Sequence, residues 1–379
     1  MTELGLMKIF RRTVLSHIIS ILISVFVSGY RGKVVQICQS SPCHRTTIAH
    51  FLNAGKWDEE LLRARLKDKI IEIVWEESMR SGKPIECIGD DTIFSKTKPA
   101  LSAMHPIECA YFHYSHLKRQ QDYGLQAVGI LLACNGKTFL YDIILYDKTC
   151  SKIEILKNVA EELPVALNIS YFLCDCWYSC PEIMEAFLKK GFYTIGAIKT
   201  NRVIFPRGIR IQIQQYAQYI RKGDPSVSLV TVAGRKYYVY RYEGNLSNVE
   251  NAIVLICFPR NAFGNLHAMR AFISTDISLS SQEILNRYTH RWRIEVFFRQ
   301  AKQKLSMDKF QIRSRVGIVR FCLLMSLAHF LCCTAVDSDS SFQAGYAFFQ
   351  KHILTERITY IYNCGKCLEA LDDLLSLIA

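Results

Sequence analysis

The chain has 379 residues and half of them are hydrophobic, so it can bury a large core and is not intrinsically disordered. Lysine and arginine number 47 against 34 acids, and the formal charge of +13 suits a polyanionic partner, although many basic proteins bind no nucleic acid. The 15 cysteines lie mostly in apolar runs and are odd in number, which excludes a simple disulfide framework and favours a reducing cytoplasm.

Residues 1–82 have helical patterning and are predicted to form an N-terminal DNA-binding domain. Residues 14–28 (VLSHIISILISVFVS) follow the basic sequence KIFRR and resemble a signal peptide or a short membrane anchor. The run is short for a membrane span of about 20 residues and contains His17 and four serines, so we predict a buried helix and no membrane association. A helix pair with Arg45 and Lys56 near its ends could read DNA, or it could belong to a plain helical bundle.

Residues 83–335 are predicted to form an α/β catalytic domain with a mixed sheet. Strands are expected at 85–91, 124–134, 138–146, 168–175 and 192–199, with helices at 151–163 and 181–190. Asn135-Gly136 indicates a tight hairpin between the second and third strands. This β-β-β-α-β-α-β order is that of a ribonuclease-H-like fold. A β-rich insertion is expected at about 200–275, then helices at 281–305 and 316–334, and a C-terminal helical tail at 336–379.

Acidic residues end two of the predicted strands. Asp90 and Asp91 end the first strand and Asp175 ends the fourth, and these two strands are neighbours in this strand order. The carboxylates would then be close enough to hold magnesium, which prefers oxygen ligands. Taken singly, each aspartate could instead cap a turn or a helix.

The helix predicted at 281–305 supplies a third acid. At 100° per residue, five side chains fall within about 80° of one another, in a stripe that can join a metal site and hold DNA phosphates. Glu295 could also make an ordinary surface ion pair with an arginine four residues away. The stripe consists of Tyr288, Arg291, Glu295, Arg299 and Lys302.

The spacing Y-(2)-R-(3)-E-(6)-K in this helix resembles the signature of DDE transposases of the insertion-sequence-four family. The segments GDDTIFSK and FLCDCWYSCPEI are similar to the family's two aspartate blocks, and the resemblance covers about residues 85–335. It implies a metal-binding catalytic triad of Asp91, Asp175 and Glu295. Asp91 is preferred because Thr92 follows it, with Asp90 as the alternative.

The resemblance also implies the partners and the reaction. Tyr288, Arg291 and Lys302 would contact the phosphates of the transposon ends. The expected protein is a bacterial cytoplasmic, nucleoid-associated transposase that binds terminal inverted repeats and target DNA as a homodimer. It would use two Mg²⁺ ions, or Mn²⁺, for strand cleavage and strand transfer. Alternatives are a catalytically silent DNA-binding regulator derived from a transposase, a metal-dependent nuclease of the same fold, and a membrane-attached protein.

Overall fold

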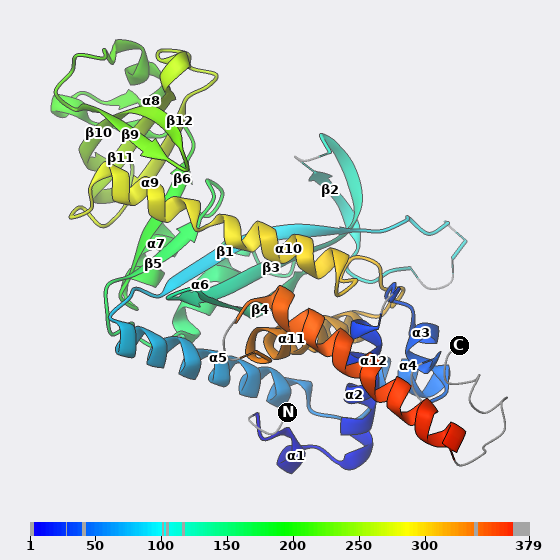
Figure 1. Ribbon diagram of the computed structural model, residues 1–379. Coiled ribbons are helices and arrows are strands. Elements are labelled where there is room, and N and C mark those ends of the chain that lie inside the picture. The colour runs from blue at the N-terminus through cyan, green and yellow to red at the C-terminus, as the bar shows by residue number, and fades with distance from the viewer. Residues whose placement is uncertain are drawn as a thin grey trace.

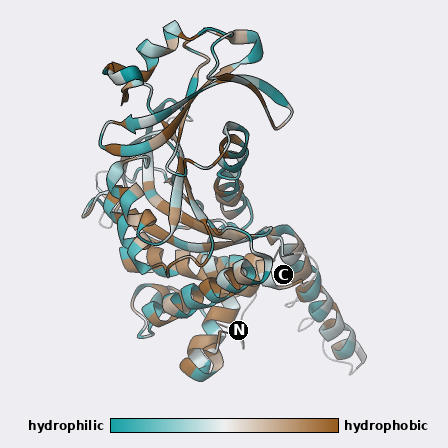
Figure 2. Cartoon of the chain, turned by 90° about the vertical axis from the view of Figure 1, so that its left-hand side faces the viewer, coloured by the Kyte–Doolittle hydropathy of each residue, from teal (hydrophilic) through white to brown (hydrophobic). Residues whose placement is uncertain are grey.

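A mixed twelve-stranded sheet runs through the computed structural model, which describes residues 4–27, 29–39, 43–100, 102–103, 106–115, 118–336 and 340–366 (Figure 1). The strand order is β2-β3-β1-β5-β6-β12-β11-β10-β7-β8, with β4 paired to β3 and β9 paired to β10. Hydrophobic residues follow the strands and the helices packed against them (Figure 2). The fold is therefore α/β, consistent with the ribonuclease-H-like prediction.

The first half of the sheet follows the predicted order. β1 pairs antiparallel with β3 and parallel with β5, so the predicted adjacency of the first and fourth strands is confirmed. Asn135 and Gly136 both have positive φ, 48° and 88°, as the predicted tight turn between β3 and β4 requires. The strand β2 and the extension of β1 to Ser95 were not predicted. The strands are β1 (Glu86–Ser95), β2 (Tyr111–Ser115), β3 (Gln120–Cys134), β4 (Lys137–Tyr146), β5 (Ser170–Cys174) and β6 (Phe192–Ile198).

Helices cover both faces of β1 and β3. On one face lies α10 (Trp292–Gln303), and its Phe298 ring would come within 2.8 Å of a Cβ atom at Gly129 of β3. On the other face lies α6 (Lys152–Glu162), whose Leu156 contacts Gly89 of β1. α7 (Pro181–Leu188) joins β5 to β6 and packs beside α6. Both faces of β1 are therefore covered by helices, its first four residues are buried, and Asp90 and Asp91 are only partly exposed. A polar side chain on either face is expected to have a partner there.

Residues 203–274 extend the same sheet. β12 pairs antiparallel with β6 from Ala271 opposite Ile198 to Ser274 opposite Ile195. The predicted β-rich segment therefore continues the sheet from the edge formed by β6. The segment is rich in strands, as expected from the sequence. The elements are β7 (Val203–Ile204), η1 (Pro206–Gly208), β8 (Ile211–Gln212), α8 (Ile213–Tyr216), η2 (Ala217–Tyr219), β9 (Val227–Val232), β10 (Arg235–Leu246), β11 (Val249–Pro259), η3 (Arg260–Ala262) and β12 (Arg270–Ser274).

The single helix predicted at 281–305 is wrong in one respect, because the chain forms two helices. α9 spans Ser281–Thr289, and α10 begins at Trp292. At the junction, the amides of Arg291, Arg293 and Ile294 donate to carbonyl oxygens three residues earlier, so the helix tightens locally. A capping box of Ser280 and Glu283 begins α9 as the sequence pattern permits.

The terminal helices pack together below the sheet (Figure 1). The predicted buried helix at 14–28 corresponds to α2, which contacts α3, α11 and α12. Among the described residues, α11 alone is long and apolar enough to cross a membrane, and 83% of that window is buried inside the protein. Residues 337–339 and 367–379 of the predicted tail lie outside the described residues. The helices are α1 (Leu6–Ile9), α2 (Arg12–Phe26), α3 (Val34–Gln39), α4 (Arg45–Asn53), α5 (Glu59–Ser81), α11 (Arg315–Thr334) and α12 (Phe342–Lys366).

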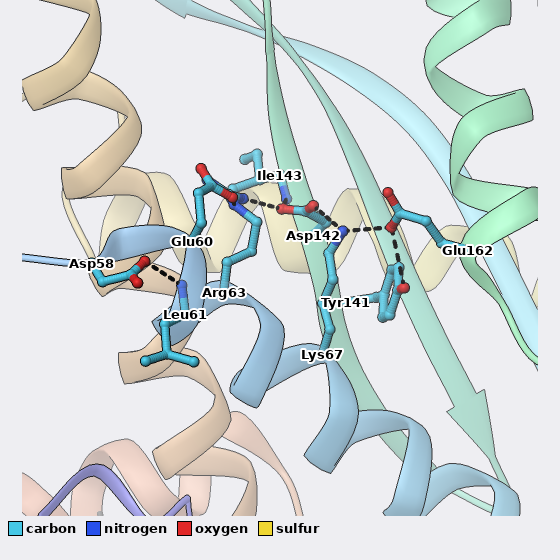
Figure 3. A network of polar contacts seen from close by, with 9 residues as sticks. All are labelled: Asp58, Glu60, Leu61, Arg63, Lys67, Tyr141, Asp142, Ile143 and Glu162. Carbon is cyan, nitrogen blue, oxygen red and sulfur yellow. Dashed lines mark hydrogen bonds and ion pairs between the residues drawn. The ribbon is translucent and has the colours of Figure 1, made fainter. Parts of the chain in front are cut away.

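A buried ion network fixes α5 to the sheet (Figure 3). Asp142 of β4 is 5% exposed and accepts from Arg63 at 2.7 Å and from Lys67 at 2.8 Å. Lys67 also reaches Glu162 at the end of α6, at 2.7 Å. Because removal of one member would leave an uncompensated charge, the network strongly favours one position of α5.

Candidate active site

The two adjacent aspartates of β1 point to opposite faces of the sheet. Successive side chains of a strand alternate, so Asp90 shares its face with Glu86 and Thr92. All three contact the α9–α10 region: Glu86 binds His290 and Arg293 at 2.6 Å each, Asp90 binds Arg291, and Thr92 binds Lys302. Asp91 lies on the α6 face instead.

Asp91 has its own set of partners on that second face. The Tyr178 hydroxyl donates to Asp91 Oδ1 at 2.7 Å, and Lys152 Nζ lies 3.1 Å from Oδ2. The Gln126 amide also donates to Oδ2. The Asp91 carboxylate is thus held by three side chains, and none of them comes from α10.

Asp175 follows β5 in register with Asp90. The last paired residues of the parallel strands β1 and β5 are Gly89 and Cys174, so the next residue of each strand is Asp90 and Asp175 respectively. Residues in register on parallel strands point to the same face. Burial, followed by the charge of Asp175, raises the pKa of Asp90 from 3.8 to about 7. The charge of Asp175 therefore acts on Asp90, and the charge of Asp91 acts in turn on Asp175.

Arg291 connects these acids to α10. Its Nη1 donates to Asp90 Oδ2 at 2.8 Å, and its Nη2 donates to Glu295 Oε1, so one guanidinium bridges the strand and the helix. Its charge also acts on Asp175, whose pKa is raised by burial first, lowered by the Trp177 and Tyr178 amides, raised by the charge of Asp91 and lowered by Arg291. Asp90 and Glu295 thus both bind one arginine, and Asp175 lies within reach of its charge. Of the predicted triad, Glu295 binds Arg291, Asp175 is influenced by both Arg291 and Asp91, and the side-chain partners of Asp91 lie on the α6 face.

The other residues of the predicted stripe differ in their surroundings. Tyr288 packs on Phe272 with ring centroids 4.7 Å apart, and burial raises its pKa to about 12. Lys302 donates to Thr92 Oγ1 at 2.7 Å and to the carbonyl of Ile93 at 3.0 Å, and burial lowers its pKa. Arg299 is exposed and makes no ion pair with any residue that the structure describes. Arg299 is therefore the cation of the stripe best placed to meet a phosphate.

Glu86 and Lys96 position the site and were missed in the sequence. Glu86 is 5% exposed, and its two ion pairs fix the α9–α10 junction over β1. Lys96, just after β1, donates to the carbonyls of Asp308 and Phe310 at 2.7 Å each and fixes the segment after α10. Glu86 could have been found from the sequence, because it lies four residues before Asp90 on the same strand and therefore on the same face.

The donor set of this site fits a divalent cation, although the present arrangement is not a closed metal site. Within the described ranges, no three His, Cys, Asp or Glu side chains converge closely enough to hold a metal ion. Asp90 and Asp175 nevertheless supply oxygen ligands at a buried surplus of negative charge, which their raised pKa values report. Arg291 now supplies the compensating charge, so a bound cation would compete with its guanidinium.

Two family models match the chain. A family model described as "Transposase DDE domain" matches residues 87–331, and one described as "DDE superfamily endonuclease" matches residues 6–154. No curated protein is found to match the chain. The first match spans well over half of the chain and includes Asp90, Asp91, Asp175 and α10. The protein therefore belongs to the family of transposases with a DDE domain.

Proposed function

We propose that this protein is the transposase of an insertion sequence, of the insertion-sequence-four type, that binds terminal inverted repeats and catalyses strand cleavage and strand transfer. The supporting observation is the bridging of Asp90 and Glu295 by Arg291, with Asp175 directly after the strand that pairs with β1. Two acids from distant parts of the chain thus bind one cation, and the charge of a third, Asp175, acts on Asp90. Such a group is what phosphodiester chemistry on DNA requires.

In this proposal the catalytic carboxylates are Asp90, Asp175 and Glu295, with Asp90 in place of the Asp91 expected from sequence. They would hold two Mg²⁺ ions, or Mn²⁺, which when bound supply Lewis-acid stabilisation of the oxygens that attack and leave phosphorus. Arg291, released from its bridge, would bind a phosphate oxygen through its fixed fork of donors. Exposed Arg299 would hold a neighbouring phosphate. Lys302 and Tyr288 would support these contacts from partly buried positions.

The proposed partners are terminal-repeat and target DNA, bound by a homodimer in the bacterial nucleoid. The formal charge of +13 supports a polyanionic partner. The N-terminal helices α1–α5 remain the predicted DNA-binding domain. A catalytically silent regulator derived from a transposase would keep DNA binding and lose cleavage.

The test uses a duplex that carries the DNA flanking the reading frame. Glu295→Gln and Asp175→Asn are expected to abolish Mg²⁺-dependent cleavage, by roughly a thousandfold or more, while binding of the duplex stays near wild type. Glu154→Gln, at an exposed carboxylate of α6, is the matched control and should cleave normally. Strand-transfer products would distinguish a transposase from a nuclease. Wild-type cleavage by either acid variant would contradict the assignment.

A further inference from the structure

The segment that joins α6 to β5 carries its apolar side chains outward. Val165, Leu167 and Ile169 are exposed to 59%, 63% and 59% respectively. Asn168, which lies between two of them, is half-buried, and Ser170 is fully buried. A loop on a free surface usually has the opposite pattern, with polar groups in water and apolar groups inside. The inverted pattern indicates a surface that contacts another molecule.

Hydrogen bonds from two helices fix the segment in this orientation. The Asn168 side-chain amide donates to the carbonyl and the hydroxyl oxygen of Ser78, on α5, at 3.0 and 3.1 Å. The backbone amide of Ala166 donates to the carbonyl of Lys190, just after α7, at 2.8 Å. The outward direction of Leu167 is therefore set by the fold, and a partner would not have to order the segment.

The two helices that hold the segment add apolar side chains of their own. Met79 follows Ser78 on α5 and is 64% exposed, and Leu188 ends α7 and is 49% exposed. Single exposed apolar residues are ordinary, but a group from three adjoining parts of the chain is typical of a contact surface. The α5–α7 patch consists of Met79, Val165, Leu167, Ile169 and Leu188.

The charges around the α5–α7 patch favour a protein partner over DNA. The stretches 76–83, 161–170 and 185–190 contain five acids and four bases, whereas the whole chain has a formal charge of +13. A polyanion would gain little from so balanced a surface. The exposed charges of both signs include Glu161, Glu185, Lys83 and Lys189. Such a surface is complementary to a copy of itself, because a two-fold axis can place acids of one copy near bases of the other.

The α5–α7 patch lies at the opposite end of β5 from the candidate active site. Ile169 immediately precedes this strand and Asp175 immediately follows it, so the two are separated by roughly 20 Å. A partner bound to the patch would leave Asp175 open to DNA. Two copies joined at their patches would therefore both keep an accessible active site.

We propose that the α5–α7 patch is the surface through which two copies of this chain pair, patch against patch, about a two-fold axis. The inference locates the homodimer of the proposed function and rests on that function for the need of two active sites. The apolar side chains form the centre of the interface, and the mixed charges form its rim. The balanced charge of the patch limits the repulsion between two strongly basic chains.

Sedimentation velocity of the full chain without DNA, over a range of micromolar concentrations, tests the pairing. Wild-type protein is expected to sediment as a dimer. Leu167→Asp should raise the dissociation constant of the dimer by roughly a hundredfold or more, because the two-fold axis brings two carboxylates into the apolar centre. Wild-type protein that stays monomeric, or Leu167→Asp that dimerises as wild type does, would overturn the inference.

Leu354→Asp is the matched control, since it makes the same chemical change on another exposed apolar surface. Leu354 is 58% exposed and lies on α12, which also exposes Ile358 and Tyr362. This variant should dimerise as wild type does. A monomeric Leu354→Asp beside a dimeric Leu167→Asp would overturn the inference and place the contact on α12.

A mixture of two variants tests whether like patches meet. Leu167→Asp and Leu167→Lys should each be monomeric alone and should associate when mixed, because opposite charges then face each other across the axis. No association in the mixture would overturn the pairing of patch with patch. Cleavage of the flanking duplex separates the two proposals: a wild-type monomer that cleaves overturns only this inference, and a wild-type dimer without Mg²⁺-dependent cleavage overturns only the proposed function.

Discussion

The two faces of β1 carry adjacent aspartates with different surroundings. On the α10 face, Asp90 meets Arg291 and lies in register with Asp175, so acids outnumber the cation between them. On the α6 face, Asp91 meets Lys152 and the hydroxyl of Tyr178, so its charge is already compensated. Because side chains of a strand alternate between faces, Asp90 lies at a site that can accept a further cation, whereas Asp91 lies at one where Lys152 already compensates the charge.

The electrostatics of the α10 face are typical of a catalytic site, and those of the α6 face are typical of a structural contact. A buried group whose pKa is shifted by another charge is common where a reaction is carried out, because the shift records a charge that substrate or metal can neutralise. Burial first and a neighbouring carboxylate after it raise the pKa of Asp90 and of Asp175. The contacts of Asp91 instead connect Lys152 to the sheet.

The largest expected difference between the two faces is in catalysis. Asp90→Asn should lower Mg²⁺-dependent cleavage of the flanking duplex by roughly a thousandfold or more, because it removes a proposed metal ligand. Asp91→Asn should lower it by only about tenfold, through a misplaced Lys152. Single-turnover cleavage rates, with duplex binding measured in parallel, check both values. The reverse ranking would restore Asp91 to the triad and remove the assignment made from the structure.

The choice between these two aspartates shows what the sequence could and could not supply. The strand order, the adjacency of β1 and β5, and the placement of Glu295 on a helix facing the sheet all follow from local patterns and are found in the structure. The direction of Asp90 and Asp91 does not, because β1 is covered on both faces and its residues from Glu86 to Gly89 are all buried. Hydropathy does not alternate along such a strand, so the sequence does not show which of its residues face α10 and which face α6.

Contacts between residues far apart in the chain could not be predicted from the sequence either. The sequence placed the stripe on the helix as a set of neighbours and offered an ion pair of Glu295 with an arginine four residues away. Nothing in the sequence indicates that Lys302 donates into β1 or that Arg291 also binds Asp90. These two contacts join residues about two hundred positions apart, and only the tertiary fold brings them together. Glu86 of β1 likewise binds His290 and Arg293 at the junction of α9 and α10, more than two hundred positions away in the chain.

A second difference concerns stability in the metal-free protein. Asp90 titrates at about 7 when folded and near 3.8 when unfolded, so the unfolded chain releases its proton first as pH rises. Stability is therefore lost between about pH 4 and pH 7 and stays low above that range. Asp90→Asn cannot ionise and should be more stable than wild type above pH 7, by about 4 kcal/mol.

Urea unfolding in the presence of a chelator, at about pH 4.5 and about pH 8, measures this difference. The advantage of Asp90→Asn should be present at the higher pH and small at the lower one. Asp91→Asn serves as the comparison, because it only weakens the contacts with Lys152 and Tyr178 and should destabilise the protein at the higher pH. A variant of Asp90 with no gain at the higher pH would show that Arg291 already compensates that carboxylate fully.

The smallest expected difference is in metal affinity, and it separates the two faces directly. Arg291→Gln removes the guanidinium that now occupies the space between Asp90 and Glu295, so Mn²⁺ should bind about tenfold more tightly. Lys152→Gln removes the corresponding cation beside Asp91 and should leave Mn²⁺ affinity unchanged, because that carboxylate is not a proposed ligand. Titration of free Mn²⁺ by electron paramagnetic resonance, without DNA, measures both constants independently of cleavage. Tighter binding in the Lys152 variant alone would place the metal on the α6 face, since only loss of a competing cation at the ligand itself can raise affinity there.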